Sequence, residues 1–250
     1  MSRDILSFHH VGFSYAPSAA FIEDLNLTVD EGKFICLLGA NGSGKSTILK
    51  LGSGIYTPST GSITLWNKPL RDYRGKDKAK LLSYLPQVLD LGVPFRVREL
   101  VEMGRYPYGD VPPALCVSDA LRMVGLGSKE NSFVNTLSGG ERRRAFLAMT
   151  LLQGAGVLLL DEPLANLDIK YQLELVRLLR NIENVTVVMA LHDINMAFEF
   201  DTVILVKKGG IIGAGTPEEM LTQEMLEEAF EVTLAVKRIG RQAFISYREE

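Results

Sequence analysis

The sequence has few cysteines, no long apolar runs and little excess charge of either sign. Its 250 residues include two cysteines, 27 Lys and Arg, and 30 Asp and Glu, which gives a net charge of −3. Two cysteines provide neither a disulfide framework nor metal-ligand spacing, and the apolar run 34–38 around Cys36 favours a buried packing role for that thiol. The small, well-distributed charge gives no support to nucleic-acid binding, and we expect no nucleic-acid partner.

Membrane-spanning and export signals are also missing from the sequence. No apolar segment approaches the roughly 18 residues that a membrane span requires, and the first residues lack the apolar core of a signal peptide. We therefore expect a cytosolic chain that reaches a membrane only through a partner. Its length and its 46% hydrophobic content suit one large α/β domain.

Apolar strands alternate with helical segments along most of the chain. Fully apolar strands between helices predict a parallel sheet covered on both faces. The charged run 71–80 is expected to be a solvated helix start or loop, and 97–136 to be mostly helical. Strands are expected at 5–15, 22–29, 33–38, 62–66, 81–85, 157–161, 185–190 and 202–206, and helices at 141–153, 170–182, 193–199 and 217–230.

The segment GANGSGKST, from Gly39 to Thr47, fits the phosphate-binding loop pattern G-x-x-x-x-G-K-[ST]. Its glycines let backbone N–H groups approach phosphates, and the helix that follows points its positive end at the same charges. We expect Lys45 on the β- and γ-phosphates of ATP and the Ser46 hydroxyl on Mg²⁺. A glycine-rich turn with an incidental lysine is the alternative, which the preceding strand and following helix disfavour. The expected nucleotide contacts are Gly39, Asn41, Gly42, Gly44, Lys45, Ser46 and Thr47.

Two carboxylates, Asp161 and Glu162, end the apolar run 157–160. The carboxyl ends of parallel strands are where ligands bind in such sheets. Asp161 is expected in the Mg²⁺ shell, and Glu162 is placed to orient or deprotonate an attacking water. A solvated acidic turn is the alternative, and the phosphate loop upstream makes it the weaker one.

A second candidate anion site is the segment LSGGE at 137–141. Ser138 is expected to cap a helix that begins with two glycines and presents accessible N–H groups. One ATP does not need two such helix starts from the same domain. The economical explanation is that the second start serves an ATP held by another copy of the chain.

In this order the three segments resemble the ATP-binding cassette (ABC) ATPases, and the likeness covers nearly the whole chain. The resemblance implies an α/β fold with a P-loop NTPase core, a mostly parallel sheet, an N-terminal antiparallel β subdomain and a helical subdomain. We expect a single domain over 1–250. Within it, 1–86 and 157–250 would form the RecA-like core with the β subdomain, and about 88–156 would form the helical subdomain.

The resemblance also implies a homodimer in the ATP-bound state, with two copies facing head to tail. Ser138 and Gly140, with Gly139 between them, would contact the γ-phosphate of the partner copy's ATP. Four further residues, which would indicate nothing on their own, match family motifs by their order and position in the sequence. Gln87 matches the Q-loop glutamine near Mg²⁺ and the attacking water, Asp168 the D-loop, His192 the switch histidine on the γ-phosphate, and Tyr15 the aromatic residue that stacks on adenine. The expected catalytic set is Lys45, Gln87, Glu162 and His192.

Two positions depart from the commonest pattern of this family. Glu141 and Arg143 both stand where many relatives carry glutamine. We expect Arg143 to face away from the phosphates and to have little effect. Because Glu162 and His192 are both present, we expect a site that hydrolyses ATP.

The sequence contains no membrane domain, so the resemblance implies separate permease subunits and a peripheral position at the cytoplasmic face of the membrane. Segments 97–107, 167–172 and 191–197 resemble ATPases that energise uptake of iron–siderophore, haem or vitamin B12 complexes. The permease would be gripped near Gln87 and 88–108, and a periplasmic or extracellular binding protein would act indirectly. Importers of molybdate, tungstate, zinc or manganese are the alternative. Soluble ABC ATPases that act on DNA or ribosomes are disfavoured, because only about 90 residues without heptads separate Thr47 from Leu137 and the chain holds one cassette.

Overall fold

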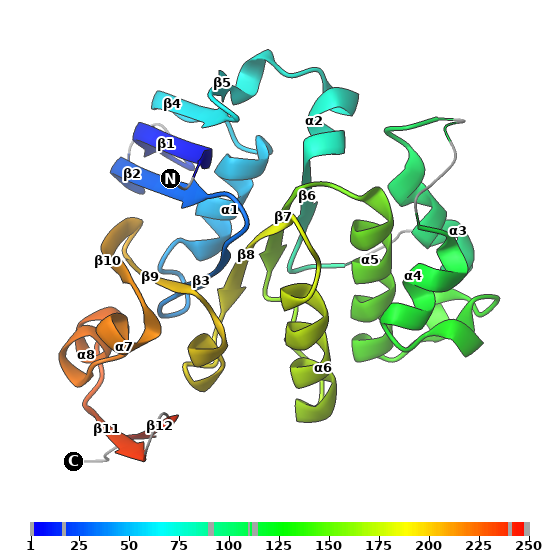
Figure 1. The fold of residues 1–250 in the computed structure, drawn as a ribbon. Coiled ribbons are helices and arrows are strands. Elements are labelled where there is room, and N and C mark those ends of the chain that lie inside the picture. The colour runs from blue at the N-terminus through cyan, green and yellow to red at the C-terminus, as the bar shows by residue number, and fades with distance from the viewer. Residues whose placement is uncertain are drawn as a thin grey trace. The chain divides into compact units, whose positions relative to one another are not determined.

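The computed structural model describes residues 3–16, 19–89, 93–109, 111, 115–239 and 242–247. Contacts divide the chain, drawn as a ribbon in Figure 1, into two compact units. The first contains residues 1–72 and 186–250, and the second contains residues 73–185. By this division 73–86 and 157–185 group with the helices, whereas the sequence analysis assigned them to the strand-rich core.

The first unit begins with a four-stranded antiparallel sheet in the order β2-β1-β4-β5. Burial alternates from Leu25 to Val29 of β2, because the apolar residues there recur at every second position and cover one face only. A short 3₁₀ helix, η1, follows the last strand. The elements are β1 (Asp4–Phe13), β2 (Ile22–Asp30), β4 (Thr60–Leu65), β5 (Lys68–Pro69) and η1 (Leu70–Asp72).

Four further strands of the first unit lie in the order β10-β9-β3-β8. Strand β3 pairs in parallel with β8 and β9, and β10 pairs antiparallel with β9. Every residue of β3 and β8 is buried, as expected for parallel strands covered on both faces. The elements are β3 (Phe34–Leu38), α1 (Lys45–Ser53), β8 (Thr186–Leu191), β9 (Thr202–Lys207) and β10 (Gly210–Gly215).

Two expected helices of the first unit take a different form. The helix expected at 193–199 is the 3₁₀ helix η5 (Asn195–Glu199), because the Asp193 carboxylate accepts a hydrogen bond from the Asn195 N–H at 2.9 Å and forms a local turn. The helix expected at 217–230 is two helices, because Thr222 caps a new start. The remaining elements are α7 (Pro217–Met220), α8 (Gln223–Phe230), and the hairpin β11 (Leu234–Ile239) and β12 (Gln242–Tyr247).

The second unit is built around α5, which packs against α3 and α4. Its strands β6 and β7 pair in parallel. The segment expected to be mostly helical at 97–136 contains only short helices among its described residues. The charged helix α2 buries no residue, which confirms a solvated segment. The elements are α2 (Gly75–Leu81), β6 (Leu82–Leu85), α3 (Val97–Glu102), η2 (Met103–Arg105), α4 (Val117–Met123), η3 (Gly127–Lys129), η4 (Val134–Thr136), α5 (Gly139–Gln153), β7 (Val157–Asp161) and α6 (Ile169–Arg180).

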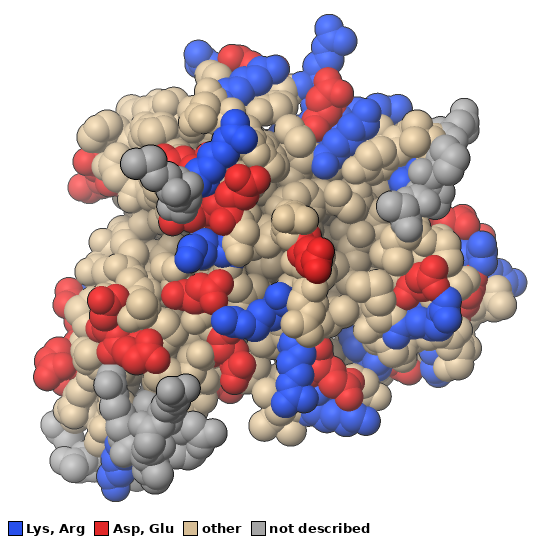
Figure 2. Space-filling model, in the orientation of Figure 1, with Lys and Arg blue, Asp and Glu red and all other residues tan. Residues whose placement is uncertain are grey.

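The described residues also bear on the expectations from composition. None of their helices combines the length and the hydropathy needed to cross a bilayer. Cys36 is buried, as expected, whereas Cys116 is exposed. On the face drawn in Figure 2, Lys and Arg side chains are interspersed with Asp and Glu.

Candidate functional site

The loop between β3 and α1 has the backbone shape of a phosphate site. Gly42 and Gly44 have positive φ angles of 77° and 117°, which only glycine adopts readily. The N-cap of α1 is Gly44, which has no side chain, and the positive end of the helix that follows attracts anions. The Ser43 hydroxyl is buried without a hydrogen-bond partner among the described residues, and a phosphate oxygen would satisfy it.

Lys45 lies within this loop. Its side chain is 4% exposed, and its Nζ donates to the carbonyl oxygens of Gly39 at 2.7 Å and Ala40 at 3.0 Å. Asn41 is exposed and Ser46 is half-buried. An ammonium group held over the loop in this way is ready to share its protons with phosphate oxygens.

Tyr15 stands beside the first turn of α1. Its hydroxyl is hydrogen-bonded to the Thr47 hydroxyl, and its ring lies edge-on to Phe13 at a centroid distance of 5.0 Å. The residue is nevertheless 60% exposed, so a flat ligand can reach it. The structure therefore brings the tyrosine expected to stack on adenine to the helix that follows the phosphate loop.

His192 also belongs to the first unit. It follows β8 directly and is exposed, and the register of β8 with β3 places Leu191 opposite Leu38. The residues that come next, His192 and Gly39, therefore leave neighbouring parallel strands at the same edge of the sheet. This is the carboxyl edge at which ligands bind in parallel sheets.

The second unit brings Gln87 and Glu162 together. They follow the parallel strands β6 and β7, and Gln87 Nε2 donates to Glu162 Oε2 at 2.7 Å. The neighbouring Asp161 is 1% exposed, and its Oδ2 accepts a hydrogen bond from the Tyr84 hydroxyl at 3.3 Å. A carboxylate expected to act on water and the expected Q-loop glutamine are thus in direct contact.

Arg143, expected to face away from the phosphates and to have little effect, contacts the backbone of two expected site residues, Gln87 and Glu162. It is 6% exposed. Its guanidinium donates to the carbonyl oxygens of Glu162, of Asp161 at 3.5 Å and of Gln87 at 2.7 Å. Burial lowers the pKa of Arg143, and the negative charges of Glu162 and Asp161 oppose this shift.

The segment 138–141 forms the expected capped helix start. Ser138 Oγ accepts a hydrogen bond from the Glu141 N–H at 3.2 Å, and Glu141 Oε2 accepts one from the Ser138 N–H at 3.0 Å, which completes a capping box. The Ser138 N–H lowers the pKa of Glu141, with further contributions from the Ser138 hydroxyl and Lys129. A cleft of about 330 Å³ lies beside this start, lined among others by Ser138, Gly139, Gly140, Asn166, Leu167 and Asp168. The residues expected to reach a partner's ATP therefore share one cleft in the second unit.

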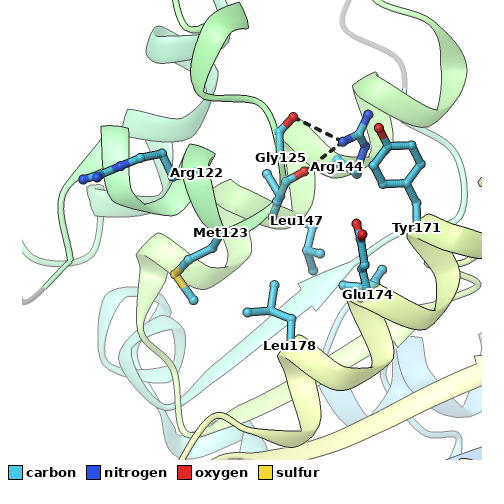
Figure 3. Close-up of a pocket in the computed structure, with 10 residues that line it drawn as sticks. Arg122, Met123, Gly125, Arg144, Leu147, Tyr171, Glu174 and Leu178 are labelled. Atoms are coloured by element: carbon cyan, nitrogen blue, oxygen red, sulfur yellow. Dashed lines mark hydrogen bonds between the residues drawn. The ribbon is translucent and has the colours of Figure 1, made fainter.

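A second buried arginine, Arg144, holds the start of α5 in place. Its Nη1 donates to the carbonyl oxygens of Val124 at 3.0 Å and Gly125 at 3.4 Å. Its guanidinium lies 4.0 Å from the centroid of the Tyr171 ring (Figure 3). Arg144 lines both the cleft at 138–141 and a neighbouring cavity of about 160 Å³. It therefore connects the N-terminal half of α5 to the segment after α4 and to α6.

Comparison with known proteins gives a consistent assignment. The sequence profile of the ABC transporter family matches residues 22–165. The petrobactin import ATP-binding protein FpuC of Bacillus anthracis is 37% identical, over 93% of this chain and 89% of its own length. The hemin import ATP-binding protein HmuV of Rhodopseudomonas palustris (strain HaA2) is 35% identical, over 88% of each chain. Among solved structures, one described as an inward-facing metal-chelate type ABC transporter is 26% identical with a TM-score of 0.78, over 98% of this chain and 97% of the matched chain.

The family match covers more than half of the chain, and it includes the phosphate loop, the helix start at 138–141 and the carboxylates Asp161 and Glu162 at the end of β7. The parallel pairing of β3 with β8 and β9, and the separate antiparallel sheet β2-β1-β4-β5, agree with the fold expected from the sequence. This chain belongs to the ABC transporter family and is an ABC ATPase.

Proposed function

We propose that this chain is the ATP-hydrolysing subunit of an importer that takes up a metal chelate through separate permease subunits. The cargo class is iron–siderophore, haem or vitamin B12. The observation that carries hydrolysis is the hydrogen bond between Gln87 and Glu162 at the end of β7. Support for import comes from the names of relatives that match about nine-tenths of the chain, one for petrobactin and one for hemin.

The residues present fit ATP and Mg²⁺. The phosphate loop suits a phosphate chain, because α1 follows a glycine N-cap, Lys45 is buried in the loop, and the Ser43 hydroxyl has no hydrogen-bond partner among the described residues. Among the described residues no three His, Cys, Asp or Glu side chains gather as a metal site. In this proposal Ser46, Asp161 and Gln87 would hold Mg²⁺ together with phosphate oxygens of ATP. Once bound, Mg²⁺ neutralises charge that develops on the transferred phosphoryl group.

The protein's own residues divide the remaining work. Glu162 orients the attacking water and accepts its proton, and Gln87 holds the Glu162 carboxylate in place. Lys45 and His192 contact the terminal phosphate, and Tyr15 stacks on the adenine ring. Each assignment follows the position of the side chain within its own unit and the matching family motif.

The cleft beside 138–141 serves a second copy of the chain in this proposal. Ser138, Gly139, Gly140 and Asp168 receive the γ-phosphate of an ATP bound to the phosphate loop of that copy. Two ATP molecules then hold a homodimer together, and hydrolysis releases it. The permease docks near Gln87 and 88–108, of which 90–92 lie outside the described residues. The chain acts at the cytoplasmic face of the membrane, and a binding protein delivers the cargo on the other side.

Replacing Glu162 by glutamine tests the hydrolytic half of the proposal. We expect E162Q to bind ATP, to hydrolyse it very slowly and to accumulate as an ATP-bound dimer. Phosphate release and light scattering after gel filtration, with ATP or ADP, measure both effects. The control is E183Q, which makes the same change at an exposed residue after α6. An E162Q protein that stays monomeric with ATP, or that keeps full turnover, contradicts the proposal.

Import is tested by capturing the tagged chain from detergent-solubilised native membranes and identifying its partners by mass. A multi-span permease is the expected partner, and a binding protein encoded or captured with it points to the cargo. Ribosomal, DNA-associated or exclusively soluble partners would overturn the transport assignment and leave the ATPase chemistry standing.

A further inference from the structure

We propose that Arg143 is a positioning residue for ATP hydrolysis, which fixes the backbone from which Gln87 and Glu162 project. It would act through Glu162 and would not itself touch ATP. The inference rests on the proposed ATPase function and adds to it a residue that the family motifs do not assign.

The contacts of Arg143 join two strand ends. Nη2 donates to the Gln87 carbonyl at 2.7 Å, after β6, while Nη1 donates to the Glu162 carbonyl and, at 3.5 Å, to the Asp161 carbonyl at the end of β7. Its side chain is almost fully buried, so water does not compete for these donors. The guanidinium is planar and rigid, so one group can hold carbonyls from two segments in a fixed relation.

Glu162 needs such support because its backbone is strained. Its φ of 51° lies in the left-handed region, which residues with a Cβ adopt reluctantly. Arg143 holds its carbonyl oxygen, and Gln87 Nε2 holds its carboxylate at 2.7 Å. The same guanidinium also holds the Gln87 backbone, so Arg143, Gln87 and Glu162 are each hydrogen-bonded to the other two. Arg143 contacts the backbone of both partners, and Gln87 and Glu162 contact each other through their side chains. Loss of Arg143 frees both strand ends, and the Glu162 carboxylate then samples positions away from the attacking water.

A positioning role and a merely structural role make different kinetic demands. ATP affinity in the proposal rests on the loop 39–47, so displacement of Glu162 lowers kcat and leaves KM for ATP nearly unchanged. Displacement of a catalytic group by about 1 Å can cost on the order of 100-fold in rate. If Arg143 only stabilised the fold, its replacement would lower the unfolding temperature. It would then change kcat and KM together, or leave both unchanged.

The first experiment compares R143M, R143K and R143Q with wild type by steady-state ATPase kinetics and thermal unfolding. We expect R143M to lower kcat by about 10- to 100-fold with KM for ATP within about threefold of wild type. R143K and R143Q retain a donor and recover part of the loss. The matched control is R177M, which removes an exposed arginine from α6 and should stay within about twofold of wild type. Wild-type kcat in R143M, or equal losses in all three Arg143 variants and R177M, would overturn the inference.

The second experiment asks whether Arg143 acts through Glu162. In an E162Q background, adding R143M should change the residual single-turnover rate by less than about twofold, because the group being positioned is already lost. If R143M lowers the rate in the E162Q background by the same factor as in wild type, the inference is refuted. If R143M does not fold, R143K and R143Q in both backgrounds provide the same comparison. A wild-type chain without ATPase activity would refute the proposed function. An active wild type together with Arg143 variants of unchanged kcat would refute only this inference.

Discussion

Replacing Gly39 by alanine measures how tightly the phosphate loop is built into the first unit. An alanine Cβ would lie 2.1 Å from the Val206 carbonyl oxygen and 2.9 Å from Ser43 Oγ, and real Cβ atoms essentially never approach within 3.0 Å. The loop and β9 must therefore separate by about 0.9 Å, the difference between 3.0 and 2.1 Å. Because β9 is paired with β10 on one side and β3 on the other, the loop gives way.

The magnitude of the effect follows from this geometry. Overpacking costs about 1–3 kcal/mol, which lowers Tm by roughly 2–12 °C for a chain of this size. Lys45 Nζ donates a hydrogen bond to the Gly39 carbonyl at 2.7 Å, so displacement of the loop would break this bond and move the ammonium group. A misplaced Lys45 would lose a charge-assisted hydrogen bond to a phosphate oxygen, which is worth about 1.5–3 kcal/mol, and the Kd for ATP would rise roughly 10- to 150-fold.

Thermal unfolding and an equilibrium titration with ATP measure the two effects. The control is G75A at the start of α2, where an added Cβ meets nothing within 4 Å and both quantities should stay at their wild-type values. A G39A protein with wild-type Tm and wild-type ATP affinity would refute the reasoning. A G39A protein that loses stability but keeps its affinity would show that the Lys45 contact is not needed to bind ATP.

Two further predictions concern Tyr15 and Glu141. Y15A should raise the KM for ATP by roughly 5- to 150-fold, since stacking on a base is worth about 1–3 kcal/mol. Y15F keeps the ring and should change KM by less than about threefold. Similar effects of the two variants on KM would argue against stacking. E141Q removes the charge from the capping box. The Ser138 N–H holds the pKa of Glu141 below its ordinary 4.5, so the carboxylate stabilises the folded state above that pH and loses this effect as pH falls through the lowered pKa. Denaturant unfolding should therefore show the largest difference between wild type and E141Q near pH 7 and convergence in acid, and a difference that does not change with pH would exclude the charge as its source.

Elements with strong local signals were predictable from the sequence. Strand β7 has the expected bounds, 157–161, because an uninterrupted apolar run before two carboxylates admits one interpretation. The phosphate loop lies between a buried strand and a helix that begins at Lys45, as its pattern requires. The capped helix start at Ser138 was also indicated, since serine before two glycines is a typical N-cap sequence.

Helix breaks were harder to predict, because hydrophobic periodicity continues across them. The segment 217–230 keeps an apolar stripe, but Thr216 and Thr222 each accept a hydrogen bond from the N–H three residues later and start separate helices. The apolar face of such a segment is set by burial, whereas its breaks are set by side-chain caps that compete locally with the helix.

Arg143 shows a different limit of sequence reasoning. On a helix an arginine is normally assigned to solvent, and nothing within a few residues marks this one as buried. Its acceptors lie 18, 19 and 56 positions away in the chain, and all are backbone carbonyls, which carry no residue-type signal. Only the fold brings them to one guanidinium. Because Arg143 holds the carbonyl of Glu162 while Gln87 holds its carboxylate, backbone and side chain are constrained by different partners. Arg143 can therefore hold the strained backbone of Glu162 while Gln87 keeps its contact with the Glu162 carboxylate. For this reason we expect Arg143, although its difference from the usual glutamine looks minor in the sequence, to affect turnover.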